Sequence, residues 1–281
     1  MTSRLLLCTD MDRTVIPNGR QPEHPQAREQ FRRLCALPAV TLVYVSGRHL
    51  QLVEQAIADY QLPQPDYAIT DVGTKIYRRE QAAWTGMDAW QQQIAGDWRG
   101  KSHHQLQQTL SRFPELILQE QSKQNDFKLS YYLSLDADRE RLLRQVDEQL
   151  NQLGVAASLI WSVDEPARVG LLDVLPRNAT KLHGIEFLQQ SLGYAAQEVI
   201  FAGDSGNDLP VLGSSIRSIL VANAEAEVKQ QALQLAERNG YPDTLFLAQP
   251  DTFPLGGNYS AGVLQGIAYF APEMTRQLTD E

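Results

Sequence analysis

Two carboxylates stand at the end of a short apolar run near the N-terminus. The run covers residues 5–8, and Asp10 and Asp12 follow it after Thr9. A continuous apolar run of this length favours a strand that is buried on both faces. Open α/β sheets bind their ligands at the carboxyl ends of such strands. Two carboxylates are costly to hold together there without a cation, so the pair indicates metal or acid–base chemistry, with solvated acids at a strand end as the alternative.

A second pair of carboxylates, Asp204 and Asp208, follows the apolar run over residues 199–202. A tight turn would explain Gly206, Asn207 and Asp208. It would not explain why Asp204 stands directly after the strand. Hard oxygen ligands in this number suit Mg²⁺, a cation that often pairs with a substrate phosphate. The four acids together therefore predict a Mg²⁺ site.

Two further segments have the residue types that bind anions. Ser46, Gly47 and Arg48 stand between a β-rich run and a helical pattern, where N–H groups favour an anion, although a plain helix cap by Ser46 explains the hydroxyl as well. Lys181 stands at the expected start of another helix. A cation there is unfavourable for the helix dipole, so we expect a compensating anion, with an ordinary solvated lysine as the alternative.

The elements that position these residues alternate between strand and helix. Apolar runs predict strands at residues 5–8, 39–45, 67–70, 198–202, 218–221 and 244–247. Helical spacing predicts helices at residues 24–36, 49–58, 180–190, 207–212, 225–238 and 260–270. This alternation predicts an α/β fold, a Rossmann-like core whose parallel sheet is flanked by helices.

The pattern changes near residue 80. Residues 105–113 and 137–153 have helical spacing, residues 127–133 read as a strand, and residues 156–163 with 169–174 read as a hairpin whose tip is at residues 164–166. Helices with antiparallel strands make an α+β module. We therefore expect an inserted domain at residues 80–174 and a catalytic core at residues 1–79 and 175–281.

Composition excludes several classes of protein. The formal net charge of −9 over 281 residues argues against a nucleic-acid surface, which needs clustered Lys and Arg. Cys8 and Cys35 are the two cysteines, and we expect both to be reduced. The N-terminal apolar run is too short for a signal peptide, and no apolar stretch approaches the length of a membrane span. We expect a cytoplasmic protein with neither a membrane nor a nucleic-acid partner.

Taken in order, these motifs resemble those of the haloacid dehalogenase-like superfamily of phosphatases. The set is Asp10-x-Asp12-x-Thr14, Ser46-Gly47-Arg48, Lys181 and Gly203-Asp204-x-x-Asn207-Asp208. The insertion resembles the type C2 cap of some members. Shorter matches resemble sucrose-phosphate phosphatases and related sugar-phosphate phosphatases, at residues 65–67, 72–77, 128–131, 175–177 and 260–264.

The resemblance implies a role for each core motif. Asp10 would be the nucleophile that forms an aspartyl-phosphate, and Asp12 would protonate the leaving sugar oxygen and later deprotonate the attacking water. Asp10, Asp204 and the backbone carbonyl of Asp12 would bind Mg²⁺, and Asp208 would join them directly or through water. Phosphate and substrate would be bound by Ser46, the N–H of Gly47, Arg48, Lys181 and Asn207.

The inserted domain would contact the sugar, a small-molecule phosphorylated ligand. If residues 127–133 form a strand, its odd-numbered apolar residues share one face, and Lys128, Ser130 and Tyr132 share the other. We expect the apolar face to pack on helices and Lys128 to contact the substrate. A solvated polar face is the alternative.

Arg13 departs from the family pattern, in which many relatives have a small residue or Asn at this position. A cation beside the nucleophile could contact a phosphate or a carboxylate, or lie over the surface. We expect a Mg²⁺-dependent phosphatase acting on a sugar phosphate, with a disaccharide phosphate such as sucrose 6-phosphate favoured. The alternatives are a phosphatase of a phosphorylated glycosylglycerate, a phosphomutase, and a non-catalytic phosphosugar-binding protein on the same fold.

Overall fold

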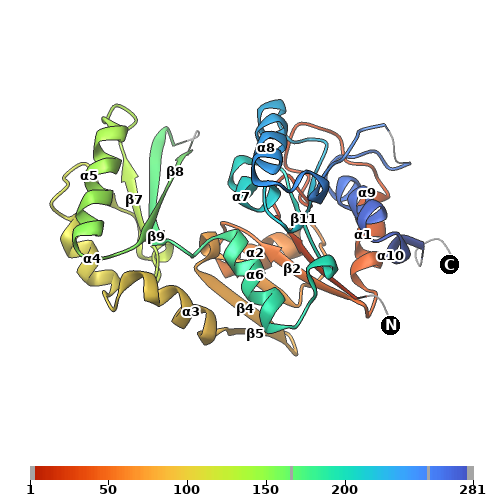
Figure 1. Ribbon diagram of the computed structural model, residues 1–281, viewed down its shortest axis with the longest axis horizontal. Helices are drawn as coiled ribbons and strands as arrows, with labels where there is room; N and C mark the ends of the chain where they lie inside the picture. The colour runs from red at the N-terminus through yellow and green to blue at the C-terminus, as the bar shows by residue number, and fades with distance from the viewer. Residues whose placement is uncertain (1–3, 165–166, 252–253, 277–281) are drawn as a thin grey trace. The chain divides into compact units, whose positions relative to one another are not determined.

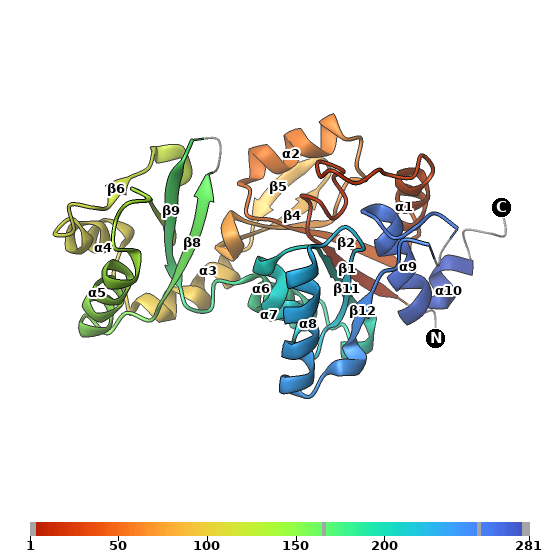
Figure 2. The ribbon, with the colours of Figure 1, turned by 90° about the horizontal axis from the view of Figure 1, so that it is seen from above.

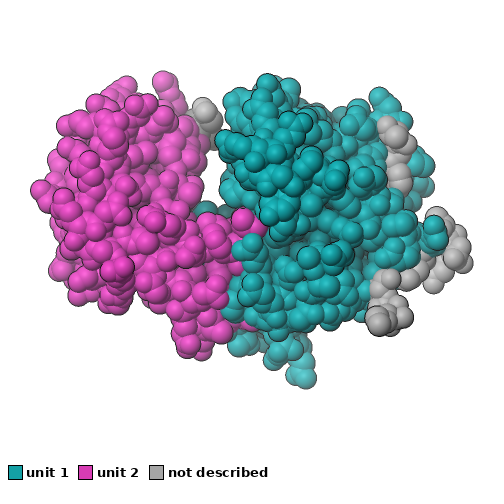
Figure 3. Space-filling view, viewed as in Figure 1, with its two compact units in different colours: residues 1–86, 184–281 teal, residues 87–183 magenta. Residues whose placement is uncertain are grey.

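The structure, a computed structural model, describes residues 4–164, 167–251 and 254–276. The chain divides into two compact units (Figure 3). The first unit contains Met1–Gly86 and Gly184–Glu281, and the second unit contains Met87–His183. Within the described part of the chain, no helix is both long enough and apolar enough to cross a bilayer.

The first unit is built on one eight-stranded sheet. Its strands are β1 (Leu5–Thr9), β2 (Val40–Val45), β3 (Tyr67–Thr70), β4 (Lys75–Glu80), β5 (Ala83–Gly86), β10 (Val199–Gly203), β11 (Arg217–Leu220) and β12 (Leu245–Leu247). Their order is β12-β11-β10-β1-β2-β3-β4-β5. All neighbours from β12 to β3 pair in parallel, and only β4 and β5 are antiparallel additions. The predicted α/β fold with a parallel sheet is confirmed.

Helices cover both faces of this sheet (Figures 1 and 2). They are α1 (Ala27–Cys35), α2 (Leu50–Asp59), α6 (Lys181–Ser191), α7 (Leu209–Leu212), α8 (Ala226–Asn239), α9 (Ser260–Phe270) and α10 (Pro272–Arg276). Figure 2 shows α1, α2 and α9 on one side of the strands and α6, α7 and α8 on the other. Every residue of β1 is buried, which is why residues 5–8 are continuously apolar rather than alternating with polar ones.

The central position of β1 gathers the motifs at one edge. In the register of the sheet, Thr9 lies between Tyr44 of β2 and Ala202 of β10. Asp10 therefore leaves the sheet beside the ends of both neighbouring strands, where Ser46 and Asp204 begin their loops. Parallel strands place all of these carboxyl ends on the same side, as the prediction of a shared site requires.

A hairpin extends the sheet past the boundary that we expected near residue 80. β4 pairs with β3, and β5 pairs with β4. The sheet of the first unit therefore extends through main-chain hydrogen bonds to Gly86. The change in composition near residue 80 thus marks exposed strands rather than the end of the sheet. At the other end the first unit resumes at Gly184, inside α6, where we expected residue 175.

The second unit is an antiparallel sheet with helices packed against it. Its strands are β6 (Ile117–Leu118), β7 (Leu129–Leu133), β8 (Ala157–Asp164) and β9 (Val169–Pro176), and its helices are α3 (Asp88–Ala95), α4 (His103–Leu110) and α5 (Arg139–Gln152). Leu129, Tyr131 and Leu133 are buried in a core with residues of α4 and α5, as predicted for the apolar face of this strand. Of the predicted hairpin tip, residues 165–166 lie outside the described residues.

Short 3₁₀ helices connect several elements. They are Asp71–Gly73, Gly96–Trp98, Gln121–Lys123, Ala196–Glu198, Gly206–Asp208 and Pro242–Thr244.

Candidate active site

Three buried carboxylates meet at the ends of β1 and β10. The exposed fractions of Asp10, Asp204 and Asp208 are 6%, 2% and 0%, and one oxygen of each lies within 4.8 Å of the others. β1 sets the position of Asp10, whose N–H donates to the carbonyl of Ala202 at 2.8 Å. Like charges this close are costly without a cation, and carboxylate oxygens are the ligands that Mg²⁺ prefers. This carboxylate triad (Asp10, Asp204 and Asp208) therefore fits a divalent cation.

The turn after β10 aims Asp208 into the triad. Its Oδ2 accepts hydrogen bonds from the N–H groups of Asp204 and Ser205, both at 3.1 Å. Gly203 gives it room, because a Cβ on that residue would lie 2.6 Å from the Cγ of Asp208. The glycine is thus required by close approach of a carboxylate.

Asp12 lies outside the triad and pairs with Arg48. Its Oδ2 accepts from Nε of Arg48 at 2.8 Å, and its Oδ1 accepts from Nη2 at 2.6 Å and from Nδ2 of Asn18 at 2.8 Å. The hydrogen bond to Asp12 raises the pKa of the Arg48 guanidinium. Arg48, which the sequence assigned to phosphate or substrate, has a protein carboxylate as its partner in this structure.

Ser46 is buried beside this pair and is not the cap of α2. The N-terminal cap of α2 is His49, so the alternative that Ser46 is a plain helix cap is wrong. Ser46 donates its N–H to the carbonyl of Ile69 at 2.8 Å, and its Oγ accepts from the N–H of Arg48 at 3.2 Å. A Cβ at Gly47 would have no atom within 4 Å, which leaves space beside its backbone.

Asp71 is a buried acid at the same edge that we did not single out from the sequence. It follows β3 and donates its N–H to the carbonyl of Arg48 at 2.9 Å, while its Oδ2 accepts from Oγ1 of Thr70 at 3.0 Å. Asp71 and Val72 both have left-handed backbone, with φ of 51° and 60°. Such strain is characteristic of functional sites. The sequence contains the same signal for Asp71 as for Asp10, because each is a carboxylate close after a buried strand.

Arg13 lies against the triad. Its Nε is 3.2 Å from Oδ2 of Asp204, and its Nη2 is 3.2 Å from Oε1 of Glu225. Thr14, the last residue of the first motif, is buried and donates from Oγ1 to Oδ1 of Asp204 at 3.4 Å. Asp204 and Glu225 thus both form ion pairs with Arg13.

The remaining predicted site residues have different surroundings. Lys181 is buried at the start of α6, in the last residues of the second unit. Asn207 is exposed and accepts from Oγ of Ser205 at 3.0 Å. Lys128 precedes β7 in the second unit and is buried, with its backbone N–H and carbonyl paired to Asn125.

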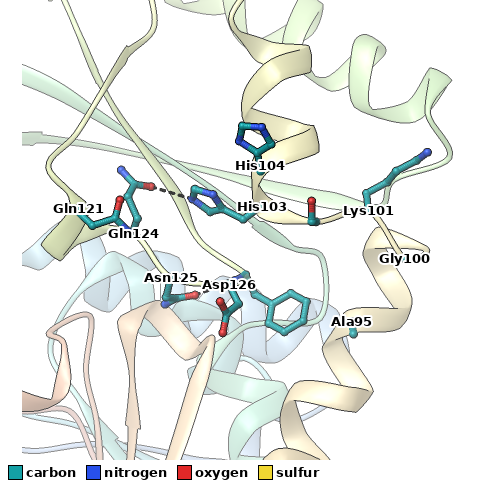
Figure 4. Close-up of a pocket in the computed structure, with 11 residues that line it drawn as sticks. Ala95, Gly100, Lys101, His103, His104, Gln121, Gln124, Asn125 and Asp126 are labelled. Carbon is teal, nitrogen blue, oxygen red and sulfur yellow. Dashed lines mark hydrogen bonds between the residues drawn. The ribbon is translucent and has the colours of Figure 1, made fainter.

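The second unit also contains a pocket of about 560 Å³, lined by both polar and apolar groups (Figure 4). In Figure 4, His103 points from the start of α4 toward Gln124, with a hydrogen bond at 3.4 Å, and Asn125 and Asp126 come from the segment before β7. Gln124 is fixed in turn, because it donates to the carbonyls of Gln119 and Ser130. A pocket of this volume is in the range that takes a ligand of disaccharide size. None of these residues was predicted from the sequence.

Comparisons with known proteins give one family. The sequence profile of the sucrose-6F-phosphate phosphohydrolase family matches residues 3–271. A protein of Nitrosococcus oceani described as a HAD-like hydrolase is 47% identical over 273 residues, which is 97% of this chain and 73% of that protein. Sucrose-phosphatase 2 of Nicotiana tabacum is 24% identical over 277 residues, and the chain spans only 59% of its length.

The fold comparison agrees. The X-ray structure of the sucrose-phosphatase from Synechocystis sp. PCC6803, solved in complex with sucrose and phosphate, superimposes with a TM-score of 0.71 at 27% identity. The match covers 95% of this chain and 98% of that protein.

Proposed function

Because the chain belongs to the sucrose-6F-phosphate phosphohydrolase family of HAD-like hydrolases, which are phosphoric monoester hydrolases, we propose that it is a Mg²⁺-dependent phosphatase of a phosphorylated disaccharide or related glycoside. Sucrose 6-phosphate is the favoured substrate. The observation that carries the proposal is the triad, in which Asp10 is held at the end of β1 with Asp204 and Asp208 within 4.8 Å. A binding protein would have no need of a nucleophile placed beside a cation site.

In the proposed reaction, an oxygen of Asp10 attacks phosphorus and forms an aspartyl-phosphate, while Asp12 gives its proton to the leaving sugar oxygen. Asp12 then takes a proton from water, the water oxygen attacks phosphorus, and phosphate leaves as the Asp10 carboxylate is regenerated. Bound Mg²⁺ would be held by the triad and the backbone carbonyl of Asp12, and it would neutralise charge on the phosphoryl oxygens.

We assign the phosphoryl contacts to Ser46, the N–H of Gly47, Arg48 and Lys181, with Asn207 in an orienting role. The open space at Gly47 and the burial of Ser46 support this assignment. Backbone N–H groups, a hydroxyl and cations are the donors that stabilise the charge of a phosphoryl group in transfer.

We further propose that the second unit selects the sugar. Its pocket combines the imidazoles of His103 and His104, the carboxylate of Asp126 and the ring of Phe127. Such a mixture of polar groups and an aromatic ring suits sugar hydroxyls and a sugar face. Lys128 follows this segment directly in the chain and remains our proposed substrate contact.

The alternative substrate with a carboxylate, a phosphorylated glycosylglycerate, loses its main support. It was suggested by Arg13 as an unexplained cation, but Arg13 pairs with Asp204 and Glu225. A disaccharide phosphate without a further acid therefore stays the favoured substrate.

Phosphate release from a panel of sugar phosphates tests the proposal. The panel contains sucrose 6-phosphate, other disaccharide phosphates, hexose phosphates and a phosphorylated glycosylglycerate, each measured with MgCl₂ and with EDTA. We expect the fastest release from disaccharide phosphates, loss of release in EDTA, and recovery when excess Mg²⁺ is added. Retained activity in EDTA would refute the metal assignment. Movement of phosphate within a hexose phosphate without release would show a phosphomutase, and no release from any compound would support a binding protein.

A further inference from the structure

We propose that Arg13 supplies part of the positive charge that the triad needs without metal and thereby lowers the affinity for Mg²⁺. The inference rests on the proposed function, because it takes the triad as the Mg²⁺ site.

The first support is the contact between Arg13 and the triad. The Nε of Arg13 lies 3.2 Å from Oδ2 of Asp204. The Asp204 side chain is 2% exposed and that of Arg13 is 36% exposed, so the cation lies between the buried carboxylate and solvent. Partial burial strengthens such a charge pair relative to one in water. The other oxygen of Asp204 faces the hydroxyl of Thr14, so each oxygen has a separate neighbour.

The second support is that the backbone aims Arg13 at this position. Arg13 has a φ of 58°, which is uncommon for a residue with a side chain. Its N–H donates to Oδ1 of Asn18 at 2.9 Å, and its carbonyl accepts from Nδ2 of Asn223 at 2.6 Å. Asn223 is itself buried and accepts from the N–H of Tyr259 at 2.8 Å. A strained backbone conformation persists only where surrounding contacts hold it in place. The hydrogen bonds to Asn18 and Asn223 hold Arg13 in this way.

The far end of the guanidinium is also held. Its Nη2 lies 3.2 Å from Oε1 of Glu225 and donates to the carbonyl of Asn223 at 3.4 Å. Glu225 is 69% exposed, so this second ion pair contributes little stability by itself. It restrains the planar fork of Arg13, so that the guanidinium stays within ion-pair distance of Asp204, although Nε and Oδ2 do not meet in hydrogen-bond geometry.

The sign of the effect on metal binding follows from these charges. Without metal, three carboxylates lie within 4.8 Å of one another, and the nearby guanidinium offsets part of their repulsion. With Mg²⁺ bound, the same guanidinium lies close to a divalent cation and is repelled by it. Arg13 therefore stabilises the metal-free protein more than the metal-bound protein, and by linkage it weakens Mg²⁺ binding.

The test uses the full chain stripped of metal, with two measurements for each variant. One is the thermal midpoint with and without MgCl₂, and the other is the dissociation constant for Mg²⁺ from isothermal titration calorimetry. For Arg13→Gln we expect the midpoint without Mg²⁺ to fall by about 2–4 °C. We expect its dissociation constant for Mg²⁺ to fall by about threefold to tenfold, as for the loss of one screened charge near the site.

Two further variants separate charge from structure. Arg13→Lys keeps the cation and should return both values toward those of the wild type. Arg20→Gln removes the same charge from an exposed arginine that lines the same surface pocket as Arg13, and it should change neither value.

Each other outcome has a defined meaning. If Arg13→Gln lowers the thermal midpoint equally with and without Mg²⁺ and leaves the dissociation constant unchanged, Arg13 is merely structural and the inference is overturned. Weaker Mg²⁺ binding by Arg13→Gln would overturn it as well, because Arg13 would then orient Asp204 as a ligand. Absence of Mg²⁺ binding by the wild type would instead remove the metal site from the proposed function, and the inference with it.

Discussion

Arg48 binds Asp12 through two hydrogen bonds, from Nε to Oδ2 at 2.8 Å and from Nη2 to Oδ1 at 2.6 Å, across 36 residues of sequence. A two-point contact of this kind is geometrically specific and favours the ionised form of a carboxylate. In the proposed reaction Asp12 has to have a proton to give to the leaving oxygen. We therefore expect Arg48 to release Asp12 when the substrate binds and to contact the phosphoryl group instead.

Replacing Arg48 tests this exchange of partners. We expect Arg48→Gln to lower kcat/KM by about tenfold or more, because Asp12 loses its orientation and the phosphoryl group loses a donor. Arg48→Lys keeps the positive charge but lacks the planar guanidinium, so its kcat/KM should lie between that of Arg48→Gln and that of the wild type. Steady-state kinetics over a range of pH measure the effect. Arg78→Gln, which removes one partner of an exposed pair with Glu80, is the control and should match the wild type. Wild-type kinetics in Arg48→Gln would contradict the role.

Replacing Asp10 tests the nucleophile. Asp10→Asn should lower kcat by at least about a thousandfold, as expected when the group that forms the covalent intermediate is lost. The fold should survive, since the amide is nearly isosteric and one of three close carboxylate charges is removed. We therefore expect a thermal midpoint without metal no lower than that of the wild type. Asp59→Asn, at an exposed position of α2, should leave phosphate release unchanged. Unaltered release by Asp10→Asn would refute the mechanism.

The close approach at Gly203 predicts a contrast between Gly203, the last residue of β10, and Gly206 in the 3₁₀ helix that follows. Gly203→Ala places a Cβ 2.6 Å from Oδ2 of Asp208, so the carboxylate has to move out of the triad. We expect lower Mg²⁺ affinity, loss of activity, and a free energy of unfolding reduced by about 1–3 kcal/mol. Gly206→Ala has no atom within 4 Å of the new Cβ and should retain activity. Urea denaturation and phosphate-release assays measure both, and equal behaviour of the two variants would contradict the packing argument.

A buried hydroxyl in the second unit predicts a dependence of stability on pH. Burial raises the pKa of Tyr131 to about 12, and within the described residues its hydroxyl has no hydrogen-bond partner. Because the folded state keeps this phenol neutral, its contribution to stability is complete below the ordinary tyrosine pKa of about 10 and is lost as pH rises toward 12.

Tyr131→Phe removes both the titration and the unpartnered hydroxyl. We expect it to raise the free energy of unfolding by about 1 kcal/mol at neutral pH and by more at pH values above 10. Tyr132→Phe is the matched control at neutral pH, because the Tyr132 hydroxyl donates to Glu120 at 2.8 Å and its loss should give no gain there. The same hydrogen bond raises the pKa of Tyr132, so the comparison at alkaline pH is with the wild type. Urea denaturation at neutral and alkaline pH distinguishes the two. A Tyr131→Phe variant that is less stable than the wild type at neutral pH would contradict the account.

Local pattern was enough to predict the parallel sheet and the order of its strands and helices along the chain. The family was expected from the resemblance of the ordered motifs to those of known phosphatases. The apolar run over residues 5–8 of β1 is recognisable because a strand buried on both faces has no solvent-facing side on which polar residues would alternate. The carboxylates after β1 and β10 were recognisable because they interrupt such runs, and the parallel sheet then brings Asp10 and Asp204 together. Asp71 gave the same signal and was overlooked.

Only the tertiary structure decided how the long side chains pair. Arg48 binds Asp12 over 36 residues, and Arg13 reaches Glu225 over 212 residues. The backbone strain at Val72 and the continuation of the sheet to Gly86 were likewise invisible in the sequence. The physical reason is that strand and helix periods are set by near neighbours in the chain. The partner of an arginine on a loop depends instead on which strand ends the fold sets side by side.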